Sequence, residues 1–208
     1  VEDTLRIRRF VEEKQPRSAV LAGGGFIGLE MAENLRELGV EVTIVQRADQ
    51  VLPPLDYDMA AQIHTLLRSH GVHLKLGSAV AGFESSGEQV VTLLEGEQPL
   101  HSDMVLLAIG VTPDTARARE AGLTLGHKGA IRVNDRMETS VSDIYAVGDA
   151  VEVEHFVTKE RAVVALAGPA NRQGRIAADN ICGGDSHFSG AQGSSVLTLG
   201  QRPAGSRG

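Results

Sequence analysis

The sequence has one cysteine, no tryptophan and few aromatic residues of any kind. The single Cys182 excludes an internal disulfide framework, and its position near the end of an expected helix indicates an incidental thiol in a reducing cytoplasm. Aromatic residues make up 3% of the chain against 42% hydrophobic residues, which predicts an aliphatic core. Such a core suits a parallel sheet that is covered by helices.

Basic residues are also in deficit, with 20 Lys and Arg against 27 Asp and Glu, and the net charge is −7. No basic cluster stands out, which argues against a nucleic-acid partner. No apolar run approaches the length of a membrane-spanning helix and no signal peptide is recognised, so we expect no membrane association and a cytoplasmic location. His70 and His73 have no thiol or carboxylate cluster beside them, and no metal site is expected. The chain begins with Val1 rather than Met, from which we expect a piece of a longer protein.

The most informative stretch is residues 19–46. It contains an apolar run typical of a buried strand (residues 19–21), the glycine pattern Gly23-x-Gly25-x-x-Gly28, a helix, and a second strand (residues 41–45). The helix is expected to bury one stripe made of Ile27, Met31, Leu35 and Leu38 and to end at Gly39, where positive φ is favourable. Strand, glycine turn, helix and strand in this order form the unit that binds dinucleotides.

Each glycine of the pattern has a separate expected role. Gly23 allows a tight turn after the strand, Gly25 lets a pyrophosphate approach the backbone at the helix N-terminus, and Gly28 lets the helix pack closely on the sheet. The end of the second strand, where a carboxylate would bind the adenosine ribose of NADH, has Gln46 followed by Arg47. This pair predicts that NADPH is accepted at least as well as NADH, although Arg47 is also compatible with a solvated loop residue.

The rest of the chain continues as alternating elements. We expect helices over residues 3–13, from a cap at Asp56 to about residue 70, and from Pro169 to about residue 181. The residues expected to face inward are Ile7, Phe10 and Val11 in the first of these helices, and Met59, Ile63, Leu66 and Leu67 in the second. We expect strands at residues 72–76 and 104–109, a hairpin of residues 80–83 and 90–94, and short strands near Leu123 and Ile131. A further buried strand is expected at residues 144–147, with Gly148-Asp149 at its carboxyl end. Alone, that dipeptide is only a common turn.

Five motifs in order, GGGFIGLEMAENL, VTIVQRADQVLPPLDYDMA, AIGVTPD, TSVSDIYAVGDA and LAGPANRQGRIAADNI, resemble the FAD-dependent pyridine nucleotide–disulfide oxidoreductases. Within that family the chain is most similar to the branch of coenzyme A-disulfide reductases and NADH oxidases. The resemblance covers residues 3 to about 195. It implies an α/β fold: a Rossmann-like parallel-sheet NAD(P)-binding domain with an antiparallel hairpin, followed by part of an FAD-binding domain.

The resemblance also implies cofactors, NAD(P)H and FAD, and site residues. For NAD(P)H these are Gly23, Gly25, Ile27 and Gly28 of the glycine turn, with Gln46 and Arg47. Phe26 matches an aromatic residue near the flavin, Glu30 a carboxylate near the nicotinamide amide, and Gly110 a close backbone approach to the cofactor. For FAD, the matching residues are Gly148, Asp149 and Ala150, and the helix that starts at Pro169 and Ala170.

By this resemblance, residues 1–14 form a connecting helix, 15–112 the NAD(P)-binding domain and 113–187 the later part of the FAD-binding domain. Residues 188–208 are expected to be a disordered tail. No FAD glycine motif, redox-cysteine motif or dimerisation domain is recognised, so no catalytic residue is assigned here and the fragment alone is expected to be inactive. The parent is expected to be a homodimer that passes hydride from NAD(P)H to FAD and on to a cysteine-linked acceptor such as coenzyme A disulfide. A non-catalytic nicotinamide-binding module, and an oxidase or ferredoxin-type reductase of the same superfamily, remain alternatives.

Overall fold

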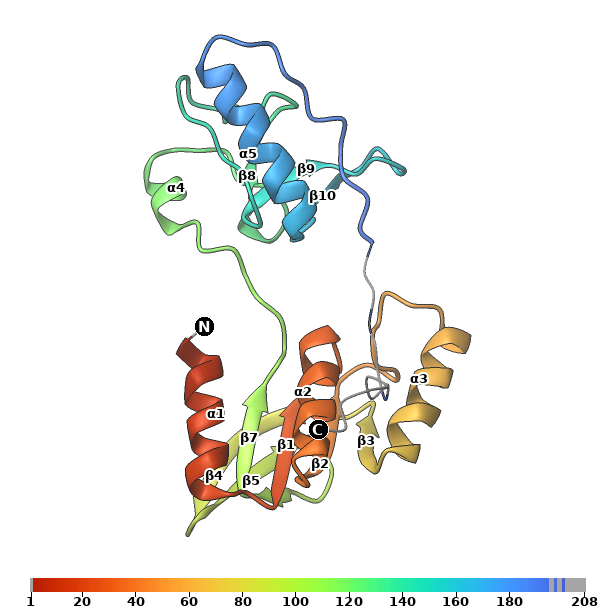
Figure 1. The fold of residues 1–208 in the computed structure, drawn as a ribbon. Helices are drawn as coiled ribbons and strands as arrows, with labels where there is room; N and C mark the ends of the chain where they lie inside the picture. Colours follow the sequence, from red (N-terminus) through yellow and green to blue (C-terminus); the bar gives the residue numbers. More distant parts are fainter. Residues whose placement is uncertain (1, 195–196, 198–199, 201–208) are drawn as a thin grey trace, which may run out of the picture. The chain divides into compact units, whose positions relative to one another are not determined.

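The computed structural model describes residues 2–194, 197 and 200 of the chain, which divide into two compact units. The first unit extends to Gly110 and includes Leu197 and Gly200, and the second begins at Val111. The division falls two residues before the boundary expected from the sequence. Figure 1 follows the chain through both units.

The first unit is built on a four-stranded parallel sheet in the order β3-β2-β1-β7. Its strands are β1 (Ser18–Ala22), β2 (Glu41–Gln46), β3 (Val72–Leu76) and β7 (Met104–Leu107). β1 pairs with β2 from Ser18↔Glu41 onward and with β7 from Ala19↔Met104 onward. The apolar run at residues 104–109 resembled a central strand, but β7 ends at Leu107 and lies at an edge of this sheet.

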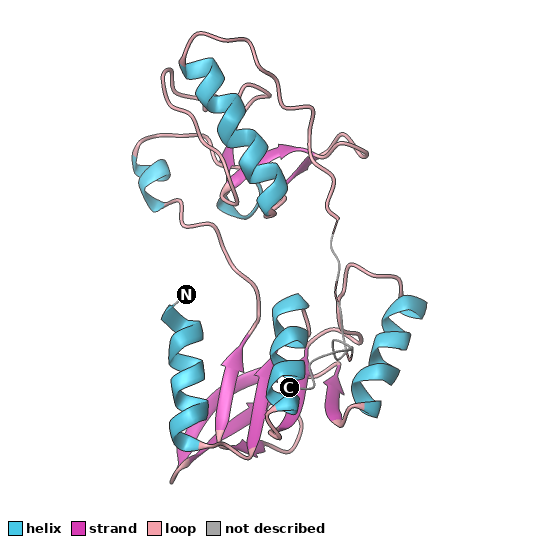
Figure 2. Ribbon diagram, viewed as in Figure 1, coloured by secondary structure: helices cyan, strands magenta, loops and turns pink. Residues whose placement is uncertain are grey.

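Alternate side chains of these strands enter two different cores, because successive residues of a strand point to opposite faces of the sheet. Leu21 and Ile44 join the core beneath the helices, whereas Val20 and Val45 pack on the other face against Leu94. That face is covered by an antiparallel sheet of β4 (Val80–Ser86), β5 (Gln89–Leu94) and β6 (Leu100–Ser102). The expected hairpin is therefore confirmed, and it forms the third layer of the unit (Figure 2).

The helices of the first unit are α1 (Glu2–Lys14), α2 (Phe26–Glu37) and α3 (Tyr57–Ser69). Figure 1 shows α2 beside β1 and β2. The buried stripe of α2 differs from the expected one: it consists of Gly28, Leu29, Ala32 and Leu35, while Ile27 and Leu38 are exposed. The helix is rotated because its small residues, rather than its largest apolar ones, face the sheet.

Three smaller expectations about the helices are also wrong. Phe10 of α1 and Met59 of α3 are exposed rather than inward. Asp56 precedes α3 at its N-cap position, but its side chain makes no capping hydrogen bond. The buried residues of α3 are Ala60, His64 and Leu67, of which Leu67 was expected to be inward. Among the described residues, no helix has the length and apolar composition needed to cross a membrane.

The second unit has a small sheet in the order β10-β9-β8 and one long helix. Its elements are α4 (Ala116–Glu120), the 3₁₀ turn η1 (His127–Gly129), β8 (Ile131–Arg132), β9 (Val151–Glu154), β10 (Arg161–Ala162) and α5 (Ala167–Ile181). α5 begins two residues before Pro169, which lies in its first turn. The buried strand expected at residues 144–147 does not form: Tyr145 makes one isolated bridge to Glu138, and Ile144 and Val147 are exposed. The strand is β9, which follows Gly148-Asp149-Ala150.

The core of the second unit combines β9, α5 and residues from the expected tail. Val151, Val153 and Ala177 pack with Phe188 and Ala191, both about 5% exposed. These two residues fall within the segment 188–208 that was expected to be disordered, and at these positions that expectation is wrong. Most of the segment beyond residue 194 lies outside the described residues.

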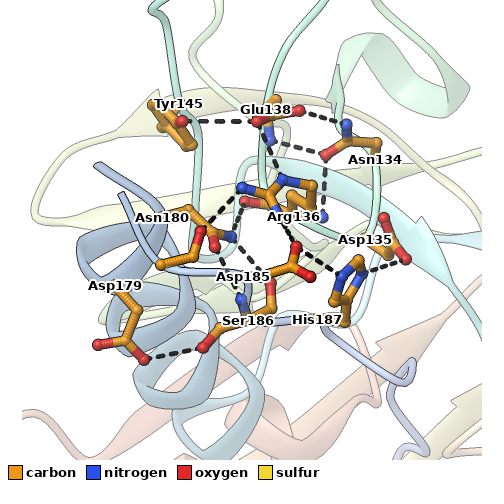
Figure 3. A network of polar contacts seen from close by, with 11 residues as sticks. Asn134, Asp135, Arg136, Glu138, Tyr145, Asp179, Asn180, Asp185, Ser186 and His187 are labelled. Atoms are coloured by element: carbon orange, nitrogen blue, oxygen red, sulfur yellow. Dashed lines mark hydrogen bonds and ion pairs between the residues drawn. The ribbon is translucent and has the colours of Figure 1, made fainter. Parts of the chain in front are cut away.

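A polar network joins the C-terminal end of α5 to the turn at residues 134–138 (Figure 3). Arg136 contacts the carboxylates of Glu138 and Asp185 and donates to the carbonyl oxygen of Gly184. The side-chain amide of Asn180 donates to the carbonyl oxygens of Arg136 and Ser186, at 3.0 and 2.8 Å. These bonds hold the chain that follows α5 against the turn at residues 134–138.

Candidate functional site

The carboxyl end of β1 lies where the parallel sheet changes direction. From β1 the chain proceeds to β2 and β3 on one side, and returns to β7 on the other. Loops at such a point leave in opposite directions and open a crevice, which is where open α/β sheets bind ligands. The glycine turn, residues 23–28, follows β1 at this position.

The structure shows a different environment around each of the three glycines of the motif. Gly23 has φ +112°, and a Cβ there would collide with the carbonyl oxygen of Ala108. A Cβ on Gly28 would collide with the carbonyl oxygen of Gly23. Gly25 is the N-cap residue of α2 in an extended conformation, and a Cβ there would meet nothing within 4 Å. Gly23 and Gly28 are thus required by packing, whereas Gly25 borders open space.

That open space is chemically suited to an anion. The first N–H groups of a helix have no partner inside the helix, and the helix dipole places partial positive charge there. At α2 these groups belong to the residues directly after Gly25. Phe26, Ile27 and Glu30 are exposed on the first turns of the same helix. Gly110, with φ +102°, lies two residues beyond Ala108 and is also exposed.

Gln46, at the end of β2, is bonded to the glycine turn. Its Oε1 accepts a hydrogen bond from the backbone N–H of Gly24 at 3.0 Å. The oxygen of the side-chain amide is therefore engaged, which leaves the amide NH₂ group as the free end. Arg47 follows on the surface and is exposed. The predicted pair Gln46 and Arg47 thus lies beside the turn, with Gln46 in direct contact.

The loop between β2 and α3 (residues 47–56) contacts the glycine turn. The N–H of Leu52 donates to the carbonyl oxygen of Gly24 at 2.8 Å. Val51 is fully buried, and its N–H donates to Nε2 of the buried His64 at 3.1 Å. Burial lowers the pKa of His64, and the positive charge of Arg68 lowers it further. The acceptor role of Nε2 requires the neutral ring, which agrees with this direction.

In the second unit, the predicted residues Gly148, Asp149 and Ala150 form the turn before β9. Gly148 has φ +89°, and its N–H donates to Oε1 of Gln173 on α5 at 2.8 Å. Asp149 is exposed, and within the described residues no hydrogen bond or ion pair engages its carboxylate. Asp149 and Ala150 line a cavity of about 660 Å³ together with residues of three other segments. These are residues 111–114, residues 127–128, and residues 161–163 with Ala165.

The basic side of this cavity is held by a buried carboxylate. Glu152 of β9 is 3% exposed, and its side chain accepts hydrogen bonds from the backbone N–H of His127 and from Nε of Arg132. Thr115 fixes the same turn by donating to the carbonyl oxygen of Gly129 at 2.6 Å. Lys128, at the tip, has φ +52°. Because side chains hold both ends of the turn, the cavity wall is formed before any ligand arrives.

The first turn of α5 holds Ala170, which is half-buried and donates its N–H to the carbonyl oxygen of Leu166 at 3.1 Å. The structure thus brings the predicted residues together in two sets. The glycine turn, Gln46, Arg47 and Gly110 belong to the first unit, and Gly148, Asp149, Ala150 and Ala170 to the second. Within the described part of the chain, no group of three or more His, Cys, Asp or Glu side chains is arranged to hold a metal ion.

Sequence reasoning missed His64, Gln173 and Glu152. His64 lies between Ala60 and Leu67 on the buried face of α3, and Gln173 lies with Ala177 and Asn180 on the buried face of α5. A polar residue at a helical spacing otherwise taken by inward residues is the signal that points to both. Glu152 had no comparable signal, since a single acidic residue in a short strand is more often exposed.

Comparison with known proteins bears on both units. Residues 3–174 match the family model described as pyridine nucleotide-disulphide oxidoreductase. The chain is 36% identical over 195 residues to an NAD(P)H sulfur oxidoreductase (CoA-dependent) of Pyrococcus abyssi, covering 93% of this chain and 43% of that protein. It is 37% identical to an NADH oxidase of Methanocaldococcus jannaschii, covering 100% of this chain and 46% of the relative.

Solved structures are also similar to this chain over most of its length. Reduced CoADR-RHD of Bacillus anthracis superposes with a TM-score of 0.91 at 48% identity, over 96% of this chain and 36% of that one. An NAD-dependent persulfide reductase from A. fulgidus superposes with a TM-score of 0.90 at 35% identity, over 96% of this chain and 37% of that one. The chain spans less than half the length of each of these relatives.

Proposed function

The chain belongs to the pyridine nucleotide-disulphide oxidoreductase family, and from this premise we propose that its first unit binds NAD(P)H at the glycine turn. The observation that carries the proposal is Gly25, because the space where its side chain would be is empty while those of Gly23 and Gly28 are filled by backbone. The pyrophosphate would take that space against the free N–H groups at the start of α2.

The other residues of the first unit would orient the nucleotide. Gln46 would present its amide NH₂ to the adenosine ribose, because its oxygen is bonded to Gly24. A hydrogen-bond donor at this place can bind the oxygens of a 2′-phosphate, and Arg47 adds a positive charge on the adjacent surface. Phe26, Ile27 and Glu30 would lie toward the nicotinamide end, with Gly110 allowing close approach of the backbone.

We propose further that the second unit contributes part of a flavin site. The carboxylate of Asp149, which has no partner among the described residues, would accept hydrogen bonds from hydroxyl groups of the cofactor. Lys128 and Arg161 add positive charge to the wall of the same cavity. Gln173 holds Gly148 and so fixes the turn that carries Asp149. The first turn of α5, with Ala170, would lie toward the flavin ring.

For the whole protein, we propose hydride transfer from NAD(P)H to FAD, followed by reduction of a disulfide, persulfide or related coenzyme A-linked acceptor. FAD, when bound, would supply the chemistry of a hydride acceptor and electron carrier, and the residues described here would bind and orient the donor. The sulfur and persulfide reductases among the relatives favour this acceptor class. NADH oxidases at similar identity support a second candidate, in which oxygen is the acceptor. We also propose a homodimer in the cytoplasm, where the exposed Cys182 would stay reduced.

The experiment that tests nucleotide binding is Gly25→Val. The backbone at Gly25 is extended and the space around it is open, so valine should fold but block the pyrophosphate. We expect titration with NADPH to show at least a tenfold loss of affinity, with at most about 1 kcal/mol of stability lost from the poorer N-cap. Equal affinities of the variant and the wild-type chain would show that the nucleotide does not bind at this turn.

A further inference from the structure

His64 is one of the few polar side chains buried in the first unit, and it lies outside the glycine turn. It is 3% exposed, on the face of α3 that otherwise carries Ala60 and Leu67. Its Nε2 accepts the hydrogen bond from the N–H of Val51 at 3.1 Å. The N–H of Val51 is buried, so an acceptor at this place avoids the cost of an unpaired donor.

Val51 in turn lies directly against the glycine turn. A Cβ on Gly24 would come within 3.0 Å of Cγ1 of Val51. The next residue, Leu52, donates its N–H to the carbonyl oxygen of Gly24 at 2.8 Å. Gly24 therefore has its carbonyl oxygen held by Leu52 and its N–H held by Gln46, and it stands between the two glycines that begin the turn.

The backbone conformation of Leu52 indicates that the surrounding residues constrain this loop. Leu52 has φ +47°, in the left-handed region that a leucine rarely adopts. Such a residue persists where its surroundings over-determine it. Leu52 is itself buried, and Gln50 donates from Nε2 to the carbonyl oxygen of Leu55 at 2.7 Å. The bond from Val51 to His64 ties the middle of this loop to the buried face of α3.

We propose that His64 is a positioning residue for nucleotide binding: its bond to Val51 holds the β2–α3 loop, which holds Gly24 and the glycine turn in the binding conformation. The inference rests on the proposed function of the turn. It predicts that a residue on the buried face of α3, without contact with the ligand, sets part of the affinity.

Three variants test it. His64→Leu removes the acceptor and keeps an apolar side chain of similar size. His64→Gln places an amide oxygen near the position of Nε2 and should restore the bond. Leu67→Ala is the matched control, because it weakens the packing of the same helix, where Leu67 is 4% exposed, and leaves the bond between Val51 and His64 in place. Each is compared with the wild-type chain at pH 7.5.

Two measurements are made on each variant: the Kd of NADPH, and hydrogen exchange of the Val51 and Leu52 amides without nucleotide. His64→Leu should weaken NADPH binding by about fivefold to tenfold and speed exchange at both amides by at least about tenfold, since a buried donor loses its partner. His64→Gln should keep both values within about threefold of wild type, and Leu67→Ala should leave the Kd unchanged in folded protein.

Wild-type affinity in His64→Leu, or a loss in His64→Gln as large as in His64→Leu, would overturn the inference. If the wild-type chain binds no NADPH, the proposed function fails. The exchange data then still decide whether His64 holds the loop, because unchanged protection of Leu52 in His64→Leu overturns that claim by itself.

Discussion

Oε1 of Gln46 accepts a hydrogen bond from the N–H of Gly24, with 3.0 Å between the two atoms. The bond joins the end of β2 to the glycine turn and fixes which end of the amide is free. A glutamate at this position could keep the bond with one oxygen and would place the other, negatively charged, where the amide NH₂ group now lies.

We therefore predict that the wild-type chain binds NADPH at least as tightly as NADH, and that Gln46→Glu selectively weakens NADPH. Two charges at about 4 Å interact by up to ~4 kcal/mol at an effective dielectric of 20, and solvent screens part of this, so we expect a loss of about tenfold. Calorimetric titration of both nucleotides measures it. Gln62→Glu, on the exposed face of α3, adds the same charge as a control. A strong preference for NADH that Gln46→Glu leaves unchanged would contradict the prediction.

Gly28 and Gly174 should respond oppositely to the same substitution. Gly28→Ala places a Cβ against the carbonyl oxygen of Gly23, whereas Gly174→Ala in α5 places one in open space. We expect Gly28→Ala to lower the free energy of unfolding by about 1–3 kcal/mol, and Gly174→Ala to raise it by about 0.5–1 kcal/mol. Urea denaturation measures both. A stabilised Gly28→Ala variant would mean that α2 does not pack this closely on β1.

His64 should make the first unit less stable in acid. Burial holds its pKa in the folded chain below the ordinary 6.5. Above that pH the ring is neutral in both states; as the pH falls below it, the unfolded chain takes up a proton before the folded chain does, and the free energy of unfolding falls. Hydrogen exchange of β1 and β2 amides between pH 7.5 and 5.5 should show this decline. His64→Gln should lessen the decline, and an identical decline in both proteins would exclude His64 as its source.

His187 should act in the opposite direction in the second unit. Its ring lies between the carboxylates of Asp135, 2.8 Å away, and Asp185, 3.1 Å away (Figure 3). The hydrogen bond to Asp135, followed by that to Asp185, raises the pKa of His187. The contribution of His187 to the free energy of unfolding is therefore complete below the ordinary pKa of 6.5, and it is lost as the pH rises through the pKa in the folded chain.

The measurement for His187 is the pH dependence of unfolding of the wild-type chain and of His187→Gln, compared from pH 6 to 8. We expect their difference in stability to be larger at pH 6 than at pH 8, and small throughout because the groups are exposed. A difference that grows with pH would contradict the pairing of the imidazole with these carboxylates.

The 208-residue chain alone should be colourless and should not oxidise NAD(P)H when FAD is added. It spans 43% of the Pyrococcus abyssi relative, and the sequence contains one glycine turn of the dinucleotide type, which we assign to the nicotinamide nucleotide. Hydride transfer requires donor and acceptor atoms held at roughly 3–3.5 Å. Absorbance near the flavin bands and the rate of NADPH loss measure the two properties. Copurified FAD with turnover would show that this chain holds a complete site.

The regular part of the first unit could be predicted from the sequence because local pattern and final packing agree there. The apolar run at residues 19–21, the glycine turn and the strand from Glu41 all form as expected. The prediction of the buried face of α2 was wrong because hydrophobic periodicity gives most weight to large apolar residues such as Ile27 and Leu38. The helix instead faces the sheet with Gly28 and Ala32, which let the backbones approach.

The second unit could be predicted less well because its irregular segments are fixed by distant partners. Ile144 and Val147 have strand-forming side chains, but Asp143 has φ +63° and the pairing of this segment as a strand is limited to one isolated bridge at Tyr145. The position of Phe188 in the core depends on α5, which precedes it directly, and on β9, which is far away in sequence. The same is true of the site: Gly25 could be found from a local motif, whereas the contacts from Gln46 to Gly24 and from His64 to Val51 exist only after folding.

The parallel sheet also determines when the first unit can be completed during synthesis. β2 follows β1 closely, but the other edge of β1 pairs with β7, and the contact between Ser18 and Asp103 joins positions 85 residues apart. Until β7 has left the ribosome, one edge of β1 has no strand beside it, although the β4–β5 hairpin can already form from local contacts. An unpaired apolar edge associates readily with other chains. This edge of the buried strand β1 is therefore covered only when residue 107 is available, and slowing translation before that point should lower the yield of folded protein.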